Sequence, residues 1–322
     1  MQSRTLGKTD LKITPLGLGC WQFAQSKGIA ALFWPAVDPA VMDGIVQAAL
    51  AGGINWFDTA EIYGGGNSER ALAAALGRQG VKPGAVTVAT KWWPLLRTAA
   101  SMRKTLPTRQ AALAPYPVDL LQIHQPVSLS SVEKQAGALA KLLKDKQVRA
   151  VGISNFGAAG MRTFHHVLKQ EGFVLASNQV RFSLADRAIE ANGTLDTAKE
   201  LGITIIAYSP LAQGLLSGRF HDDPSALKAV RFGRRQYSGM NAEGLKKTEP
   251  LVRFLQQTAA KHGASASQVA LNWLVSFHGE TVVAIPGASK VRHAEEAAGA
   301  LDFSLSATEL TEIDRLSRFS VV

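Results

Sequence analysis

The stretch INWFDTAEIYGGGNSER, residues 54–70, shows the unit from which the fold is built. A short apolar run at 54–58 ends in the carboxylate of Asp58, and Tyr63 follows within a short loop. Three glycines come next, and an amphipathic segment begins after them. An apolar run bounded by turn residues predicts a buried strand. The stretch therefore indicates a strand, a loop and a helix, with two polar side chains near the strand end.

The same alternation runs along the whole chain. Apolar or β-branched runs are separated by longer segments of helical period, which gives a rhythm of eight strands and intervening helices. The predicted strands are 15–19, 54–58, 85–91, 118–124, 148–154, 174–179, 203–209 and 281–286. Helix starts are expected at four pairs of residues: Asp38 with Pro39, Ser130 with Glu133, Ser265 with Gln268, and Ser306 with Glu309.

A helical crossover returns each strand to the same direction, so the rhythm predicts a parallel sheet. Two architectures fit it, an open doubly wound sheet and a closed (β/α)₈ barrel. The number of strands and the length of 322 residues favour the barrel. The first strand is also not followed by G-x-G-x-x-G, because only Gly17 and Gly19 are present there. We therefore expect residues 1–322 to form a single α/β TIM barrel domain.

Three segments lie outside the repeat. Residues 4–13 contain turn residues between two short apolar pieces and predict a β-hairpin ahead of the barrel, in a position to close its bottom. Residues 212–248 form a long irregular connection after the seventh strand, a kind of loop that is usually functional. Residues 306–319 begin with a capping box and predict an added helix.

Composition excludes several classes of site. Cys20 is the only cysteine, and the seven histidines have no metal-ligand spacing, so we expect no metal site. The formal charge of +10 is spread out, and its densest clusters, 231–236 and 245–247, lack stacking aromatics, which argues against nucleic-acid binding. No apolar run spans a bilayer and the amino end has no apolar signal stretch, so we expect a cytoplasmic protein without membrane contact.

The active-site residues are predicted from the strand ends. In a (β/α)₈ barrel the site lies at the carboxyl ends of the strands. Asp58, Lys91 and His124 end the second, third and fourth predicted strands, and Tyr63 follows Asp58. An ammonium beside a phenol lowers its pKa from about 10, so we expect Lys91, held by Asp58 at a wet rim, to tune Tyr63 as a proton donor. With His124 orienting a carbonyl oxygen, this set suits carbonyl reduction, and the hydride must come from a nicotinamide cofactor.

These residues and several motifs resemble the aldo-keto reductases. The motifs FDTAEIYG, ATKWW, LLQIHQP, VGISNF, SNQV, AYSPLAQG and IPGASK occur in the family's order over essentially the whole chain. The resemblance implies an NADPH-dependent (NADPH/NADP⁺) reductase of small aldehydes or ketones with the tetrad Asp58, Tyr63, Lys91 and His124.

The resemblance also implies a cofactor site. Ser154, Asn155 and Gln179 would hold the nicotinamide amide, and Tyr208 would stack on its ring. The remaining cofactor residues it implies are, for the pyrophosphate, Ser209, Leu211, Gln213, Gly214 and Leu215, and for the adenosine end, Gly287, Ser289, Lys290, Arg292, His293 and Glu296. Ala297 stands where many members have an asparagine for the adenine, so that contact departs from the family pattern.

The substrate is less well defined by the sequence. Trp21 and Trp92 follow strand ends, so we expect them to line a hydrophobic substrate pocket. The tripeptide LFW at 32–34 resembles a plant and bacterial branch that includes pyridoxal reductases. The alternative function is a nucleotide-sensing regulatory subunit, because potassium-channel β subunits resemble the same family. Neither the physiological carbonyl substrate nor the oligomeric state is indicated by the sequence.

Overall fold

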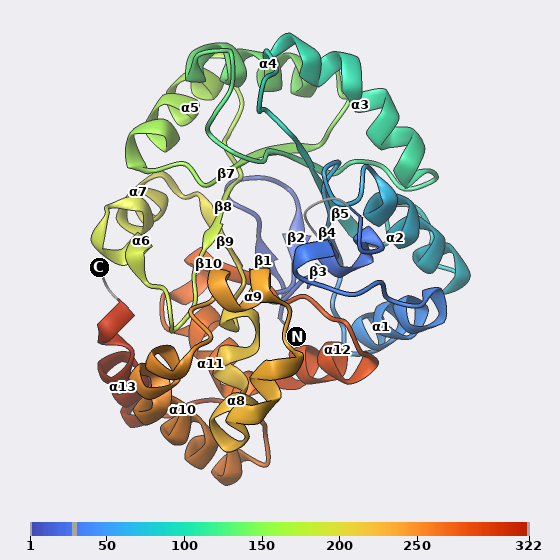
Figure 1. Cartoon of the computed structure of the whole chain (residues 1–322). Coiled ribbons are helices and arrows are strands. Elements are labelled where there is room, and N and C mark those ends of the chain that lie inside the picture. The colour runs from blue at the N-terminus through green and yellow to red at the C-terminus, as the bar shows by residue number, and fades with distance from the viewer. Residues whose placement is uncertain (1, 28–30, 321–322) are drawn as a thin grey trace.

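The barrel is the central feature of the fold. A computed structural model describes residues 2–27 and 31–320 of the chain. Eight parallel strands lie side by side in chain order, and Figure 1 shows the helices arranged around them. The strands are β3 (Leu18–Gly19), β4 (Trp56–Asp58), β5 (Thr87–Trp92), β6 (Leu120–Ile123), β7 (Ala150–Ser154), β8 (Ser177–Arg181), β9 (Thr204–Tyr208) and β10 (Val282–Ile285).

The first and last strands close the barrel. Parallel bridges join Leu16 to Ala284 and Gly19 to Gly287. Gly17 N donates to Ala284 O at 2.9 Å, beside the Trp56 indole, where a Cβ on Gly17 would lie 2.3 Å from the ring. The α/β TIM barrel is thus confirmed.

Helices form the outer layer and face the strands with their apolar sides. Their buried residues belong to one core between the strands and the helices. The helices are α1 (Pro39–Ala51), α2 (Asn67–Arg78), α3 (Ala100–Leu113), α4 (Val132–Lys144), α5 (Ala158–Gln170), α6 (Ala188–Ala191), α7 (Thr194–Leu201), α8 (Arg219–Asp222), α9 (Phe232–Tyr237), α10 (Ala242–His262), α11 (Ala266–Ser276), α12 (Val291–Ala298) and α13 (Ala307–Leu316). None of the helices in the described ranges is both long and apolar enough to cross a membrane.

The predicted helix starts are confirmed with one exception. Asp38 accepts a hydrogen bond from Ala40 N at 2.8 Å, and the capping boxes of α11 and α13 are both present. The start of α4 was assigned one residue early: Ser131 is the N-cap. Ser130 instead accepts a hydrogen bond from Ala99 N, which ties the two neighbouring loops together.

The predicted hairpin is present and fills the bottom of the barrel. Strands β1 (Arg4–Thr5) and β2 (Lys12–Ile13) pair antiparallel. Leu6, Leu11 and Ile13 pack with Trp56, with inward-facing residues of β5, β6, β7, β9 and β10, and with Ala176 just before β8, in a second apolar cluster. Because this end is plugged by side chains, a ligand can reach the interior only from the opposite rim.

The connection after β9 is more ordered than the sequence analysis expected. Residues 212–248 contain the 3₁₀ segments η3 (Ala212–Ser217) and η4 (Pro224–Ala229), the short helices α8 and α9, and the first two turns of α10. Charge and glycine content gave these short helices no clear helical pattern, and α9 is held by contacts of Arg231 and Arg234 with the segment at 31–34. Further 3₁₀ segments are η1 (Trp21–Ala24), η5 (Gly279–Thr281), η6 (Gly299–Leu301) and η7 (Arg318–Ser320).

Candidate active site

A buried ion pair lies inside the barrel, below the rim formed by the carboxyl ends of the strands. Asp58 ends β4 and Lys91 is the fifth residue of β5, and both side chains are almost fully buried. The Lys91 ammonium donates to Asp58 Oδ1 and, at 2.9 Å, to the Thr59 carbonyl oxygen. The pair therefore lies in the barrel interior and not at a wet rim as we had expected.

Two amides complete the surroundings of the Asp58 carboxylate. Gln122 Nε2 donates to Asp58 Oδ2 at 3.0 Å, and Gln179 Nε2 donates to the same oxygen at 2.9 Å. Because the carboxylate accepts from an ammonium and from two amides, it is held in one orientation. Gln122 was missed by the sequence analysis, although its place two residues before His124 in the strand pattern puts both on one face.

Tyr63 lies in the loop between β4 and α2. Its ring centre is 5.1 Å from the Lys91 Nζ. Gly64, at φ +65°, turns the chain immediately after it, and a Cβ there would lie 2.3 Å from the Ala24 carbonyl oxygen. Only glycine fits this close approach, so the turn fixes the position of Tyr63.

His124 follows β6 and stands between two aromatic rings. Its imidazole contacts the Tyr63 ring edge to face, with centroids 5.6 Å apart, and the Trp93 ring, with centroids 5.3 Å apart. Burial and the charge of Lys91 lower its pKa well below the ordinary value, so the ring is neutral at neutral pH. Among the residues that the structure describes, none hydrogen bonds to the buried Nδ1.

The pKa of Tyr63 is raised, whereas the sequence analysis expected Lys91 to lower it. Burial, then the negative charge of Asp58, raise it well above its ordinary value. The phenol in this state is therefore a protonated donor, because the loss of hydration favours its neutral form.

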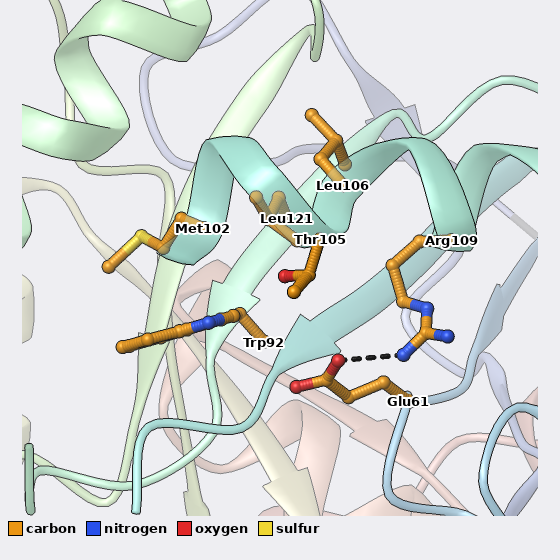
Figure 2. Close-up of a pocket in the computed structure, with 7 residues that line it drawn as sticks. All are labelled: Glu61, Trp92, Met102, Thr105, Leu106, Arg109 and Leu121. Atoms are coloured by element: carbon orange, nitrogen blue, oxygen red, sulfur yellow. Dashed lines mark hydrogen bonds and ion pairs between the residues drawn. The ribbon is translucent and has the colours of Figure 1, made fainter. Parts of the chain in front are cut away.

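Only one of the two tryptophans predicted to line the substrate pocket lies at the site. The Trp21 ring lies 6.2 Å from that of Tyr63 and 4.9 Å from that of Phe33, so it belongs to the mouth of the site. Trp92 does not: its indole donates to Ser101 Oγ, and its ring belongs to the same core as Met102 of α3. Figure 2 shows Trp92 and Met102 lining the same pocket. Successive strand residues face opposite sides, so with Lys91 pointing inward Trp92 points to the helices, and Trp93 lines the site instead.

Tyr237 of α9 is an aromatic residue near the site that the sequence analysis missed. Its ring centre lies 5.7 Å from that of Phe33, and the Arg181 guanidinium covers it at 4.5 Å. A side-chain hydrogen bond to Tyr237 contributes to raising the pKa of Tyr208, after burial and the charge of Tyr237 itself. The connection after β9 therefore reaches over the strand ends.

The residues predicted for the nicotinamide amide lie together. The Tyr208 hydroxyl donates to Asn155 Oδ1 at 2.9 Å, and Asn155 Nδ2 contacts Ser154 Oγ at 3.2 Å and the His124 carbonyl oxygen at 3.3 Å. Gln179 lies on the neighbouring strand β8, with its amide nitrogen on Asp58. All four lie at the carboxyl ends of β7, β8 and β9.

The predicted pyrophosphate segment is a run of unusual backbone. Ser209, Ala212, Gln213 and Gly214 all have positive φ, and Gln213 Nε2 donates to Ser209 Oγ at 2.8 Å. Arg234 of α9, which sequence reasoning missed, donates to the Gln213 carbonyl oxygen at 2.9 Å. Burial, then the charge of Arg219, lower the Arg234 pKa to about 10, so the guanidinium stays charged at neutral pH.

Positive charge gathers at the predicted adenosine segment. Lys290 and Arg292, both exposed, begin α12, and Ser289 N donates to His293 Nδ1 at 3.4 Å. The pKa of His293 is lowered to about 4 by burial first, and then by the charges of Arg292, Lys290 and Arg234. A cluster of three cations around one imidazole suits a polyanionic ligand. Gly287 and Glu296 flank this segment, and Ala297 is buried.

The comparisons with known proteins identify the family of this chain. The sequence model described as the aldo/keto reductase family matches residues 15–318. An uncharacterized oxidoreductase of Mycobacterium tuberculosis is 36% identical over 304 residues, which cover 92% of this chain and 87% of that protein. The chloroplastic pyridoxal reductase of Arabidopsis thaliana is 32% identical over 330 residues, covering 96% and 85%.

A solved structure shows the same fold. The aldo-keto reductase of Klebsiella pneumoniae, in complex with NADPH, superposes with a TM-score of 0.74 at 24% identity, covering 100% of this chain and 97% of that one.

Proposed function

This chain belongs to the aldo/keto reductase family, and on that premise we propose that it is an NADPH-dependent reductase of small aldehydes or ketones. Members of the family are oxidoreductases that use nicotinamide cofactors. The observation that carries the proposal is the position of Tyr63, a protonated phenol with Lys91 on one side and a neutral His124 on the other.

The residues fit the cofactor in charge and shape. The three cations around His293 suit the phosphates, of which NADPH has one more than NADH. Ser154, Asn155 and Gln179 would hold the nicotinamide amide and Tyr208 its ring, while the segment with positive φ offers backbone N–H groups to the pyrophosphate. The proposed cofactor residues are Ser154, Asn155, Gln179, Tyr208, Ser209, Leu211, Gln213, Gly214, Leu215, Gly287, Ser289, Lys290, Arg292, His293 and Glu296.

The chemistry divides between the bound cofactor and the side chains. A bound nicotinamide cofactor would supply the hydride that the carbonyl carbon accepts. As the carbonyl oxygen gains negative charge, the Tyr63 hydroxyl donates its proton to it and an alcohol results. The neutral imidazole of His124, with its proton on Nε2, donates a hydrogen bond that orients the oxygen. Lys91 stabilises the phenolate that Tyr63 becomes, and Asp58 keeps Lys91 in place.

The experiment is replacement of the proton donor. Tyr63→Phe keeps the ring and removes the hydroxyl, so kcat for 4-nitrobenzaldehyde with NADPH should fall roughly 10² to 10⁴-fold. The dissociation constant of NADPH, measured by quenching of tryptophan fluorescence, should stay nearly unchanged. A Phe variant that turns over at the wild-type rate would refute the assignment of Tyr63. A wild-type protein that binds NADPH but reduces no aldehyde would favour a nucleotide-sensing regulatory role.

A further inference from the structure

A buried carboxylate that the proposed chemistry does not use lies two residues before Tyr63. Glu61 is 6% exposed and accepts three hydrogen bonds. The donors are the backbone N–H of Trp93, the Arg97 guanidinium at 2.7 Å and the Arg109 guanidinium at 2.7 Å. The carboxylate thus joins the loop after β4 to the loop after β5 and to α3. Figure 2 shows Arg109 reaching down from α3 to Glu61.

A second buried carboxylate extends the network. Arg109 Nε lies 3.0 Å from Glu69 Oε2, and Glu69 Oε1 accepts from Thr90 Oγ1 at 2.6 Å. Glu69 is on α2, and Thr90 immediately precedes Lys91 on β5. The network therefore spans every element that carries Tyr63 or Lys91.

The inner part of the network excludes water. The space that Glu61, Arg109 and Trp92 share with Met102 and Leu106 admits no water molecule. Both carboxylates are buried, whereas the Arg109 side chain is 11% exposed and the Arg97 side chain is 38% exposed. Because the carboxylates are buried, loss of one of them leaves buried donors unmatched.

Both rings that contact His124 depend on Glu61. Tyr63 lies in the same loop as Glu61, where Gly66 N donates to the Glu61 carbonyl oxygen at 2.9 Å. The Trp93 backbone N–H donates to the Glu61 carboxylate, and the Trp93 indole contacts the His124 ring edge to face. Glu61 N also donates to the Lys91 carbonyl oxygen at 3.3 Å.

We propose that Glu61 is a positioning residue for carbonyl reduction, whose carboxylate, fixed by Arg97 and Arg109, sets the Tyr63 and Trp93 rings against His124. Glu61 touches none of the reacting groups and acts through the two rings. The proposal rests on the proposed function, because it assigns Glu61 to the alignment of the proton donor with the group that orients the carbonyl. A small displacement of such groups costs up to about 10²-fold in rate.

The test compares Glu61→Gln with a matched control. Glu190→Gln removes the charge of a largely buried carboxylate, 11% exposed against 6% for Glu61, that binds Arg187 beside Asp314 of α13, in a network that shares no residue with the active site. Both variants should lose thermal stability. Only Glu61→Gln should lower kcat, by about 10- to 100-fold, with the NADPH dissociation constant changed less than about twofold.

A milder variant tests the proposal even if Glu61→Gln does not fold. Arg97→Met removes the outermost donor and leaves Arg109 and the Trp93 backbone on Glu61. We expect a severalfold loss of kcat with native thermal stability nearly retained. Equal losses of kcat in Glu61→Gln and Glu190→Gln would overturn the positioning role, because the loss would then follow general stability.

Tyr63→Phe, measured in the same assay, separates the two hypotheses. If that variant keeps the wild-type rate, the proposed function fails and the positioning role fails with it. If Tyr63→Phe is inactive while Glu61→Gln and Arg97→Met keep full kcat, only the positioning role of Glu61 is refuted.

Discussion

The Lys91 ammonium lies 5.1 Å from the centre of the Tyr63 ring, yet the pKa of Tyr63 lies well above its ordinary value. Burial is the largest cause, and the negative charge of Asp58, with which Lys91 is paired, raises the phenol's pKa further. The ammonium therefore acts on Tyr63 as part of a neutral pair. The Lys91 charge can stabilise Tyr63 only once the phenol loses its proton and becomes negative.

The first prediction concerns the pH dependence of catalysis. The pKa of His124 is lowered and that of Tyr63 is raised, so the neutral imidazole and the neutral phenol coexist across the neutral range. We expect kcat to be flat between about pH 6 and 8, around the ordinary histidine pKa. A breakpoint near the ordinary histidine pKa that disappears in His124→Gln would contradict the neutral assignment.

The second prediction concerns the stability of the buried pair. Lys91→Met leaves the Asp58 carboxylate buried without a counter-charge, so we expect a loss of about 3–5 kcal/mol in the free energy of unfolding. Chemical denaturation measures it. The double variant Lys91→Met with Asp58→Asn should recover most of this stability but no activity. If the single variant loses little stability, the Lys91–Asp58 pair is hydrated, as the sequence analysis expected.

The third prediction uses the titration of Glu69. Burial is the main cause that raises its pKa to about 7, from an ordinary value of 4.5. The folded state therefore binds this proton more tightly than the unfolded state. The resulting stability is complete below about pH 4.5 and is lost as the pH rises through 7, an effect on the order of 3 kcal/mol. Urea unfolding at pH 5 and pH 8 should show this loss in wild type and a smaller one in Glu69→Gln.

The fourth prediction concerns NADPH against NADH. Lys290 and Arg292 are exposed cations at the start of α12, where they can meet the additional phosphate of NADPH. Hydrogen bonds to a charged group contribute about 1.5–3 kcal/mol, which is roughly ten- to a hundredfold in the dissociation constant. Replacing both residues by alanine should weaken NADPH by at least that factor at fixed ionic strength. Equal weakening of NADPH and NADH would show that these residues do not recognise the phosphate.

The fifth prediction separates the two adjacent tryptophans. Trp93→Ala removes a ring that contacts His124, so we expect it to raise KM for aromatic aldehydes and to lower kcat. Trp92→Phe changes a core residue between β5 and α3, and we expect a lower melting temperature with the kinetics retained. Steady-state kinetics and thermal melts of the pair give both readouts. If Trp92→Phe changes the kinetics and Trp93→Ala lowers only the melting temperature, Trp92 lines the substrate pocket and Trp93 does not.

The sequence alone determined the barrel and the approximate positions of its strands. Apolar periodicity and capping residues are local signals, so α11 and α13 begin where Ser265 and Ser306 predict. It also placed Asp58, Lys91 and His124 at neighbouring strand ends, because strands in chain order bring their carboxyl ends to one rim.

Only the tertiary structure decided what surrounds these side chains. Burial makes Asp58 and Lys91 a dry pair and reverses the direction of the Tyr63 pKa shift. The bonds from Glu61 to Arg97 and Arg109 join residues 36 and 48 positions apart, and no local pattern encodes such a contact. Propensity and capping act within a few residues, whereas hydration, charge pairing and the direction of a loop side chain depend on neighbours that the closed barrel brings together.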